Sequence, residues 1–109
     1  MTVRYLKHKA NGRTVVVGYE VRIHTCILAD FPCDLKGEFT IPSAVCIDGK
    51  QRTVTGISDL AFIGCSGLTR IVVPDSVLFI GKYAFSGCSD LTYAAIPRSV
   101  DVSSVAFAD

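Results

Sequence analysis

Residues 57–79, ISDLAFIGCSGLTRIVVPDSVLF, align without a gap with the residues that follow them, 80–102, IGKYAFSGCSDLTYAAIPRSVDV. Eleven of the 23 aligned positions are identical, whereas about one or two identities are expected between unrelated segments of ordinary composition. The identities include an Ala-Phe pair, a Gly-Cys-Ser triplet and a Leu-Thr pair. The chain therefore contains an internal repeat with a period of 23 residues.

Partial copies of this repeat lie on both sides of the two full copies. Downstream, the spacing of Val102, Ala106 and Phe107 matches the start of the second copy with one residue deleted. Upstream, residues 39–45 (FTIPSAV) resemble residues 71–77 (IVVPDSV), and the repeat resumes after an insertion of a few residues. The repeated region is thus expected to cover residues 38–109, with an incomplete last copy.

A period of this length is typical of a solenoid, in which each coil buries its apolar side chains only when another coil stacks on it. Proline ends each predicted strand because it has no N–H group for a neighbouring strand. Equivalent segments of the two copies should then lie side by side. We predict parallel strands over residues 68–73 and 91–96, short extended segments over 77–80 and 100–102, and helical turns over 59–65 and 82–88.

The predicted core consists of the apolar side chains that occupy repeated positions. Phe62 and Phe85 should pile on one another, and burying each ring fully contributes roughly 1.5 to 3 kcal/mol. The small Ala61 and Ala84 should let each turn approach the strands, so that leucine at either position would overpack the core. The full predicted set is Val54, Ile57, Ala61, Phe62, Cys65, Leu68, Ile71, Val73, Val77, Ile80, Ala84, Phe85, Cys88, Leu91, Ile96, Val100 and Phe107.

The first third of the chain has a different pattern. Alternating apolar residues flank Asn11-Gly12, a dipeptide that favours a two-residue hairpin turn, and they predict two or three antiparallel strands. We interpret residues 1–37 as a cap on the N-terminal end of the solenoid, within a single domain. The insertion at about residues 46–53 contains Asp48-Gly49 and predicts a loop with a tight turn.

Composition excludes several classes of function. Eleven basic and ten acidic residues give a net charge of +1. The sequence lacks the basic stripe that would predict a nucleic-acid partner. No run approaches the roughly 18 apolar residues of a membrane span. The first nine residues carry charges and do not resemble a secretory signal peptide.

The strings IPSAV (41–45) and VTGISDLAFIGCSGLTRIVVPDSVLFIGKYAFSGCSDLTYAAIP (54–97) resemble the BspA-like leucine-rich repeats, whose pattern is L-T-x-I-x-I-P-x-S-V-x-x-I-G-x-x-A-F-x-x-C. The resemblance covers residues 38–107. It implies a mainly β, right-handed solenoid of parallel strands with short helical turns, here with an N-terminal antiparallel β-hairpin cap. It also implies an extracellular or cell-surface location and a role in binding or adhesion. Ala94 and Ala95 depart from the pattern, which has larger residues there.

The five cysteines lack the paired spacing of zinc or redox sites, and their odd number leaves at least one thiol free in a monomer. Cys65 and Cys88 occupy the same repeat position and are expected to form a buried ladder of reduced thiols. Cys26 and Cys33 are expected to stay unpaired, and a disulfide between them is the alternative if the protein is extracellular.

No residue set predicts a metal, a cofactor or catalysis. His24 lies near Cys26, but no second pair of ligands at metal-binding spacing accompanies them, and His8 lies farther away. The glycine-rich phosphate-binding and nucleophile motifs are absent from the sequence. A small cysteine-dependent enzyme using Cys26 or Cys33 is the remote alternative.

The predicted binding surface is the outward side of the parallel strands, because solenoids bind along such faces. Strand alternation points Arg70 and Val72 outward in one coil and Tyr93 and Ala95 in the next. We therefore expect a non-catalytic interaction module that binds a protein or glycan partner and needs no cofactor. The alternative is a self-assembling protein whose C-terminal coil stacks on another chain to form a homo-oligomer.

Overall fold

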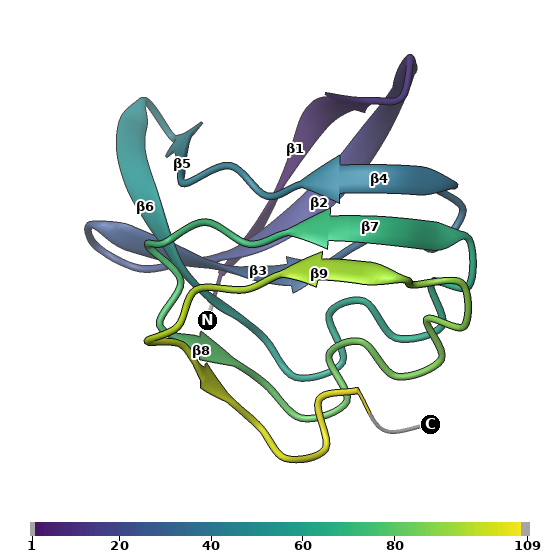
Figure 1. Ribbon diagram of the computed structural model, residues 1–109. Helices are drawn as coiled ribbons and strands as arrows, with labels where there is room; N and C mark the ends of the chain where they lie inside the picture. The colour runs from purple at the N-terminus through teal and green to yellow at the C-terminus, as the bar shows by residue number, and fades with distance from the viewer. Residues whose placement is uncertain (1, 108–109) are drawn as a thin grey trace.

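The computed structural model describes residues 2–107, which form ten strands in two sheets (Figure 1). The larger sheet has the order β1-β2-β3-β6-β8-β10 with β5 paired to β6, and the smaller sheet has the order β4-β7-β9. The strands are β1 (Val3–Ala10), β2 (Arg13–Val21), β3 (Thr25–Asp30), β4 (Gly37–Thr40), β5 (Ala44–Ile47), β6 (Lys50–Ile57), β7 (Leu68–Val72), β8 (Phe79–Ile80), β9 (Tyr93–Ala95) and β10 (Asp101–Val102).

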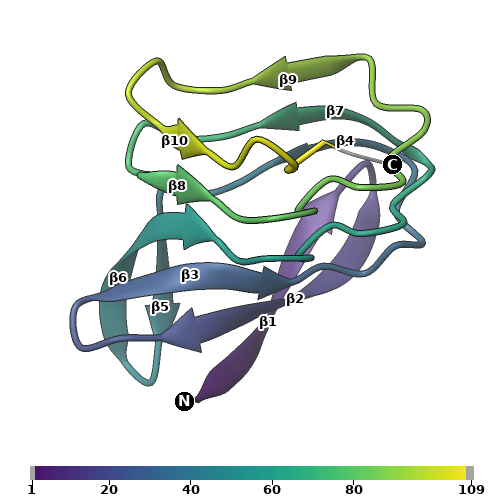
Figure 2. The same ribbon diagram turned by 90° about the horizontal axis from the view of Figure 1, so that it is seen from below.

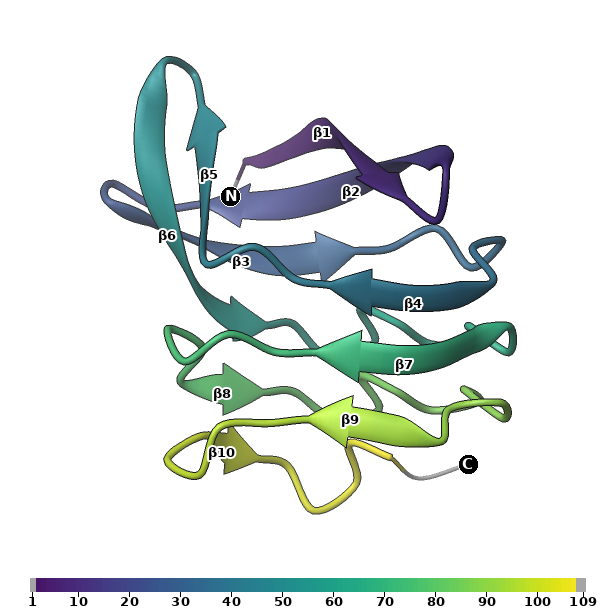
Figure 3. The same cartoon turned by 45° about the horizontal axis from the view of Figure 1, so that its top comes forward.

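The repeat has the predicted parallel pairing. Ile71 of β7 lies opposite Ala94 of β9, one period further along the chain. β8 also pairs in parallel with β10, but Ile80 lies opposite Val102, one residue short of a full period, as the deletion in the last copy requires. The upstream partial copy joins the stack, because Phe39 of β4 lies opposite Ile71. Figure 3 shows β4, β7 and β9 side by side with their arrows in one direction. The parallel strands are confirmed, although they are shorter than predicted.

The predicted helical turns are wrong: residues 59–65 and 82–88 form turns, and residues 2–107 contain no helix. Alternate N–H groups of the first turn bond to the next coil and so cannot bond along a helix. These bonds run from Leu60, Phe62 and Gly64 to the carbonyls of Lys82, Ala84 and Ser86, at 2.9, 2.7 and 2.7 Å. Leu60 and Tyr83 also have positive φ angles, 66° and 56°, which interrupt a right-handed helix.

A column of phenylalanine rings runs through the core, as predicted. The Phe62 and Phe85 centroids are 4.9 Å apart with an interplanar angle of 15°. The column continues to Phe107 at 5.1 Å and begins at Phe31, 4.5 Å from Phe62. The coils therefore stack with equivalent side chains in contact.

The predicted core is correct from Val54 to Phe85 and wrong for the predicted residues after Phe85. The residues of the set from Val54 to Phe85 are all buried. Five predicted core residues are half-buried or exposed because no further coil covers them within residues 2–107: Cys88, Leu91, Ile96, Val100 and Phe107, the last with 44% of its surface exposed.

The antiparallel hairpin at the N-terminus is confirmed. β1 and β2 pair around Asn11 and Gly12, which both have positive φ angles (52° and 76°), as a two-residue type I′ turn requires. The Asn11 side chain donates to the carbonyls of Lys36 and Glu38, at 3.1 and 2.9 Å, and so attaches the hairpin tip to the start of β4.

Part of the N-terminal third lies within the stack itself. β3 pairs antiparallel with β2 on one side and parallel with β6 on the other, and the Phe31 ring that follows β3 starts the aromatic column. In Figure 2, β3, β6, β8 and β10 follow one another from the lower part of the picture upward. The first coil therefore begins at β3, upstream of the recognisable repeats.

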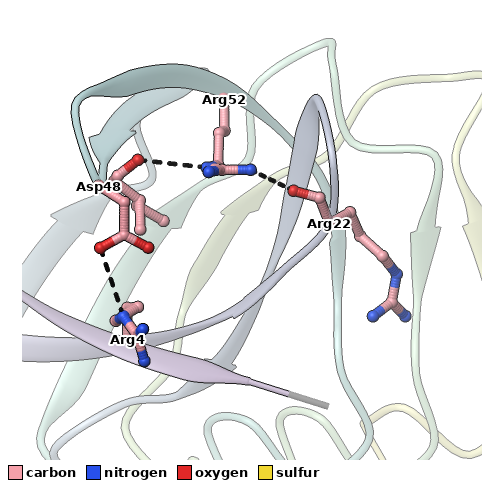
Figure 4. A network of polar contacts seen from close by, with 5 residues as sticks. Arg4, Arg22, Asp48 and Arg52 are labelled. Atoms are coloured by element: carbon pink, nitrogen blue, oxygen red, sulfur yellow. Dashed lines mark hydrogen bonds and ion pairs between the residues drawn. The ribbon is translucent and has the colours of Figure 1, made fainter.

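The insertion forms a second hairpin, β5–β6, in place of the predicted loop. Its turn residues Asp48 and Gly49 have positive φ angles of 54° and 77°. Arg52 is buried and donates to the carbonyl of Arg22 (Figure 4). It also donates to the carbonyl of Ile23 at 2.9 Å, and the two bonds join this hairpin to the β2–β3 turn. Arg4 pairs with Asp48 at 3.5 Å on the same side.

Candidate binding surface

The candidate surface is the outward side of the sheet β4-β7-β9. Inward residues of these strands, such as Phe39 and Ile71, are buried, and the alternating residues face away from the core. Parallel register arranges the outward residues in two rows across the strands. One row contains Glu38, Arg70 and Tyr93, and the other contains Thr40, Val72 and Ala95.

The first row is a contact network centred on Arg70. The Arg70 Nε atom lies 3.2 Å from Glu38 Oε2, and the guanidinium carbon lies 4.3 Å from the centroid of the Tyr93 ring. All three side chains are about half exposed. The ion pair and the cation–π contact each contribute about 1 kcal/mol or less at such exposure. Their main effect is therefore to favour one arrangement of the guanidinium and the ring on the surface.

The second row is smaller and less polar. Thr40 is exposed, whereas Val72 and Ala95 are half-buried, so this row forms a low strip beside the Arg70 row. The hairpin tip borders the surface at β4, where Lys9, Asn11 and Glu38 line a hollow with Thr40. The surface therefore has a charged and aromatic row, a less polar row and a hollow beside the hairpin tip.

The structure brings Arg70 and Tyr93 into contact and places Val72 beside Ala95, as the strand alternation predicted. Sequence reasoning missed Glu38 and Thr40. The signal for both was present, because aligning FTIPSAV with IVVPDSV places Glu38 opposite Arg70 and Thr40 opposite Val72.

The cysteine candidates lie elsewhere. Cys26 and Cys33 do not form the disulfide that sequence reasoning left open, since both thiols are free. Cys26 is buried, and desolvation raises the pKa of its thiol to about 11, which makes it a poor nucleophile. Cys65 and Cys88 also carry free thiols, with Cys65 buried and Cys88 half-buried. The sulfur of Cys33, which the sequence did not connect with this pair, lies 3.1 Å from that of Cys65.

The histidines considered as ligands are likewise apart from a metal site. His8 Nε2 lies 2.9 Å from the hydroxyl of Tyr19 within the β1–β2 hairpin, and the centroid of its ring lies 6.1 Å from that of Phe39 in β4. Over residues 2–107, no three His, Cys, Asp or Glu side chains gather where they could hold a metal ion. The same residues contain no helix of the length and apolarity that a membrane crossing requires.

In this structure the coils of parallel strands stack, and the side chains at equivalent repeat positions form columns, such as the column of phenylalanine rings. This arrangement defines a leucine-rich-repeat type of protein. The family model described as "BspA type Leucine rich repeat region (6 copies)" matches residues 39–109, about two thirds of the chain. The chain belongs to this family, whose members are typically non-catalytic binding modules. No curated protein sequence is significantly similar to the chain.

Three solved structures show the same architecture. A leucine-rich repeat protein from Bacteroides ovatus is 32% identical, with a TM-score of 0.65, over 77% of this chain and 23% of that one. A leucine-rich repeat protein from Bacteroides capillosus is 23% identical, with a TM-score of 0.70, over 94% and 95% of the two chains. A leucine rich cell surface protein from Faecalibacterium prausnitzii is 20% identical, with a TM-score of 0.52, over 89% and 31%. The chain therefore spans less than a third of the length of two of these relatives.

Proposed function

We propose that the chain is a non-catalytic interaction module that binds a protein or glycan partner through the outer face of β4, β7 and β9. The observation that supports this function most directly is the row of Glu38, Arg70 and Tyr93, in which a half-exposed Arg is held between a carboxylate and an aromatic ring. Arg and Tyr are enriched at the energetic centres of protein interfaces. Two partly fixed side chains also lose less conformational entropy when a partner binds.

In this proposal the β1–β2 hairpin, the first part of the predicted cap over residues 1–37, closes the N-terminal end of the stack that continues through residues 38–109. The bonds from Asn11 to the carbonyls of Lys36 and Glu38 support that role, because they hold the first strand of the surface in register. The relative from Faecalibacterium prausnitzii is described as a cell surface protein. We propose the cell surface or the extracellular space as the location of this chain as well.

Binding can be tested with the purified chain on a panel of immobilised extracellular proteins and on a glycan array. Arg70→Ala and Tyr93→Ala should each weaken binding to any partner found by at least about tenfold, as expected for residues at an interface centre. Lys82→Ala is the matched control, because it removes an exposed positive charge from a turn outside the surface. Equal affinities for Arg70→Ala and Lys82→Ala would contradict the proposed surface, and so would the absence of binding on both panels.

The second candidate function is self-assembly through the last coil. Phe107 is 44% exposed although its other face stacks on Phe85, and Leu91 and Val100 are half-buried. A second copy stacked on this end would cover these side chains. Sedimentation over a concentration series tests the idea, since self-assembly predicts a larger species that Phe107→Asp abolishes. A monomer at all concentrations would exclude it.

A further inference from the structure

Two cysteine sulfurs from different coils lie in direct contact. The Sγ atoms of Cys33 and Cys65 are 3.1 Å apart, and Cys33 Sγ also lies 2.9 Å from the carbonyl oxygen of Ile63. Cys33 is exposed, whereas Cys65 is 1% exposed. The pair thus combines one thiol that a reagent can reach with one that only its neighbour can reach.

The short sulfur contact follows from an irregularity in the repeat. One residue separates Phe31 from Cys33, whereas two separate Phe62 from Cys65, although both rings lie in the same aromatic column. Two cysteines in register on adjacent parallel segments have parallel side chains, which is poor geometry for a disulfide. Because Cys33 is displaced by one residue, it is not an in-register copy of Cys65, and this obstacle does not apply.

The surroundings give the two thiols different reactivities. Cys33 lies in the wall of a hollow that it shares with Ser66 and Ser89, so a small molecule can approach its sulfur. The hydrogen bond with Cys88 and burial together raise the pKa of the Cys65 thiol. The thiolate is the attacking form in disulfide exchange. Oxidation should therefore begin at Cys33 and reach Cys65 second.

We propose that Cys33 and Cys65 form a reversible disulfide that links the first coil to the second, with a low-molecular-weight disulfide such as oxidised glutathione as the oxidant. The Cys33 thiolate attacks one sulfur of the oxidant, forming a mixed disulfide and releasing one thiolate that takes up the Cys33 proton. Cys65, losing its proton, then attacks the Cys33 sulfur and releases the second glutathione thiol. Two protein thiols are oxidised and one glutathione disulfide is reduced to two thiols. This property is independent of the binding surface.

The test treats the folded chain with oxidised glutathione at neutral pH, blocks the remaining thiols and counts them after unfolding. Trypsin places Cys33, with Cys26, on the peptide 23–36, and it places Cys65 on 53–70 and Cys88 on 83–98. Wild type should fall from five thiols to three and yield a cross-link between 23–36 and 53–70. Its melting temperature should rise by several degrees and return on reduction, because a cross-link between distant residues restricts the unfolded chain.

Two variants identify the cysteines. Cys33→Ser should keep all four of its thiols, and no cross-link should form, which distinguishes Cys33 from Cys26 on the shared peptide. Cys46→Ser removes another exposed thiol and should oxidise like wild type, falling from four thiols to two. Wild type that retains all five thiols would overturn the proposal, and so would a cross-link from 53–70 to 83–98 or a cross-link that persists in Cys33→Ser.

Discussion

Phe85 is the position at which the stacking of coils can be measured as a free energy. Its ring is 2% exposed and lies between Phe62 at 4.9 Å and Phe107 at 5.1 Å, nearly parallel to both. Phe85→Ala removes the buried ring, breaks the column on both sides and leaves a cavity. Truncations of this kind cost about 3 to 5 kcal/mol. We expect a loss in that range, measured by urea unfolding followed by circular dichroism with an unchanged m value.

The matched control is Phe107→Ala, at the end of the same column. Phe107 is 44% exposed and stacks on one face only, so its truncation should cost roughly half as much, about 1 to 2 kcal/mol. Phe85→Leu provides a milder change if Phe85→Ala does not fold, and it should cost about 1 to 1.5 kcal/mol. Equal losses for Phe85→Ala and Phe107→Ala would refute the argument that each coil is stabilised by neighbours on both sides.

Three further perturbations test other contacts. Ala84→Leu adds three carbons at a fully buried position and should lower the stability of the fold by about 1 to 3 kcal/mol, measured as a lower melting temperature. An unchanged melting temperature would mean that the coils can separate to accept the larger side chain. Asn11→Gly keeps the left-handed turn but removes two hydrogen bonds to the first coil, so it should lower the free energy of unfolding in urea by about 1 to 2 kcal/mol. An unchanged free energy of unfolding would show that these bonds do not anchor the hairpin tip. Burial lowers the pKa of His8 below its ordinary 6.5, so the unfolded chain binds the proton more readily. The free energy of unfolding should therefore fall as pH drops from about 6.5 towards the folded-state pKa. His8→Gln should lose this component of the pH dependence, and an identical profile would contradict it.

Much of the candidate surface could be predicted from the sequence. The outward positions of Arg70 and Tyr93 follow from strand alternation, and their contact follows from the 23-residue spacing, because parallel coils in register place equivalent positions side by side. Glu38 could have been added from the same register. What the sequence could not supply is the geometry of the row, since the distances from the Arg70 guanidinium to the carboxylate and the ring depend on rotamers that packing selects.

The turns illustrate a different limit. Residues 59–65 have a composition compatible with a helix, but the choice between helix and turn depends on where their N–H groups bond. Alternate groups bond to the next coil, as with Phe62 to the carbonyl of Ala84 at 2.7 Å. Such long-range bonds are invisible to a local reading of the chain.

The sequence by itself determined the repeat period, the parallel pairing of its copies and the column through Phe62 and Phe85, because identical side chains at a constant interval can be buried together only by stacking. It also determined the N-terminal hairpin, because Asn11-Gly12 favours a two-residue turn between strands. The tertiary structure alone decided where the stack begins. The first coil has one residue fewer between Phe31 and Cys33 than the next coil has between Phe62 and Cys65, and it lacks the repeat motif, yet its ring completes the column and its sulfur contacts that of Cys65. Packing against the next coil requires a matching shape and leaves the intervening sequence free to change.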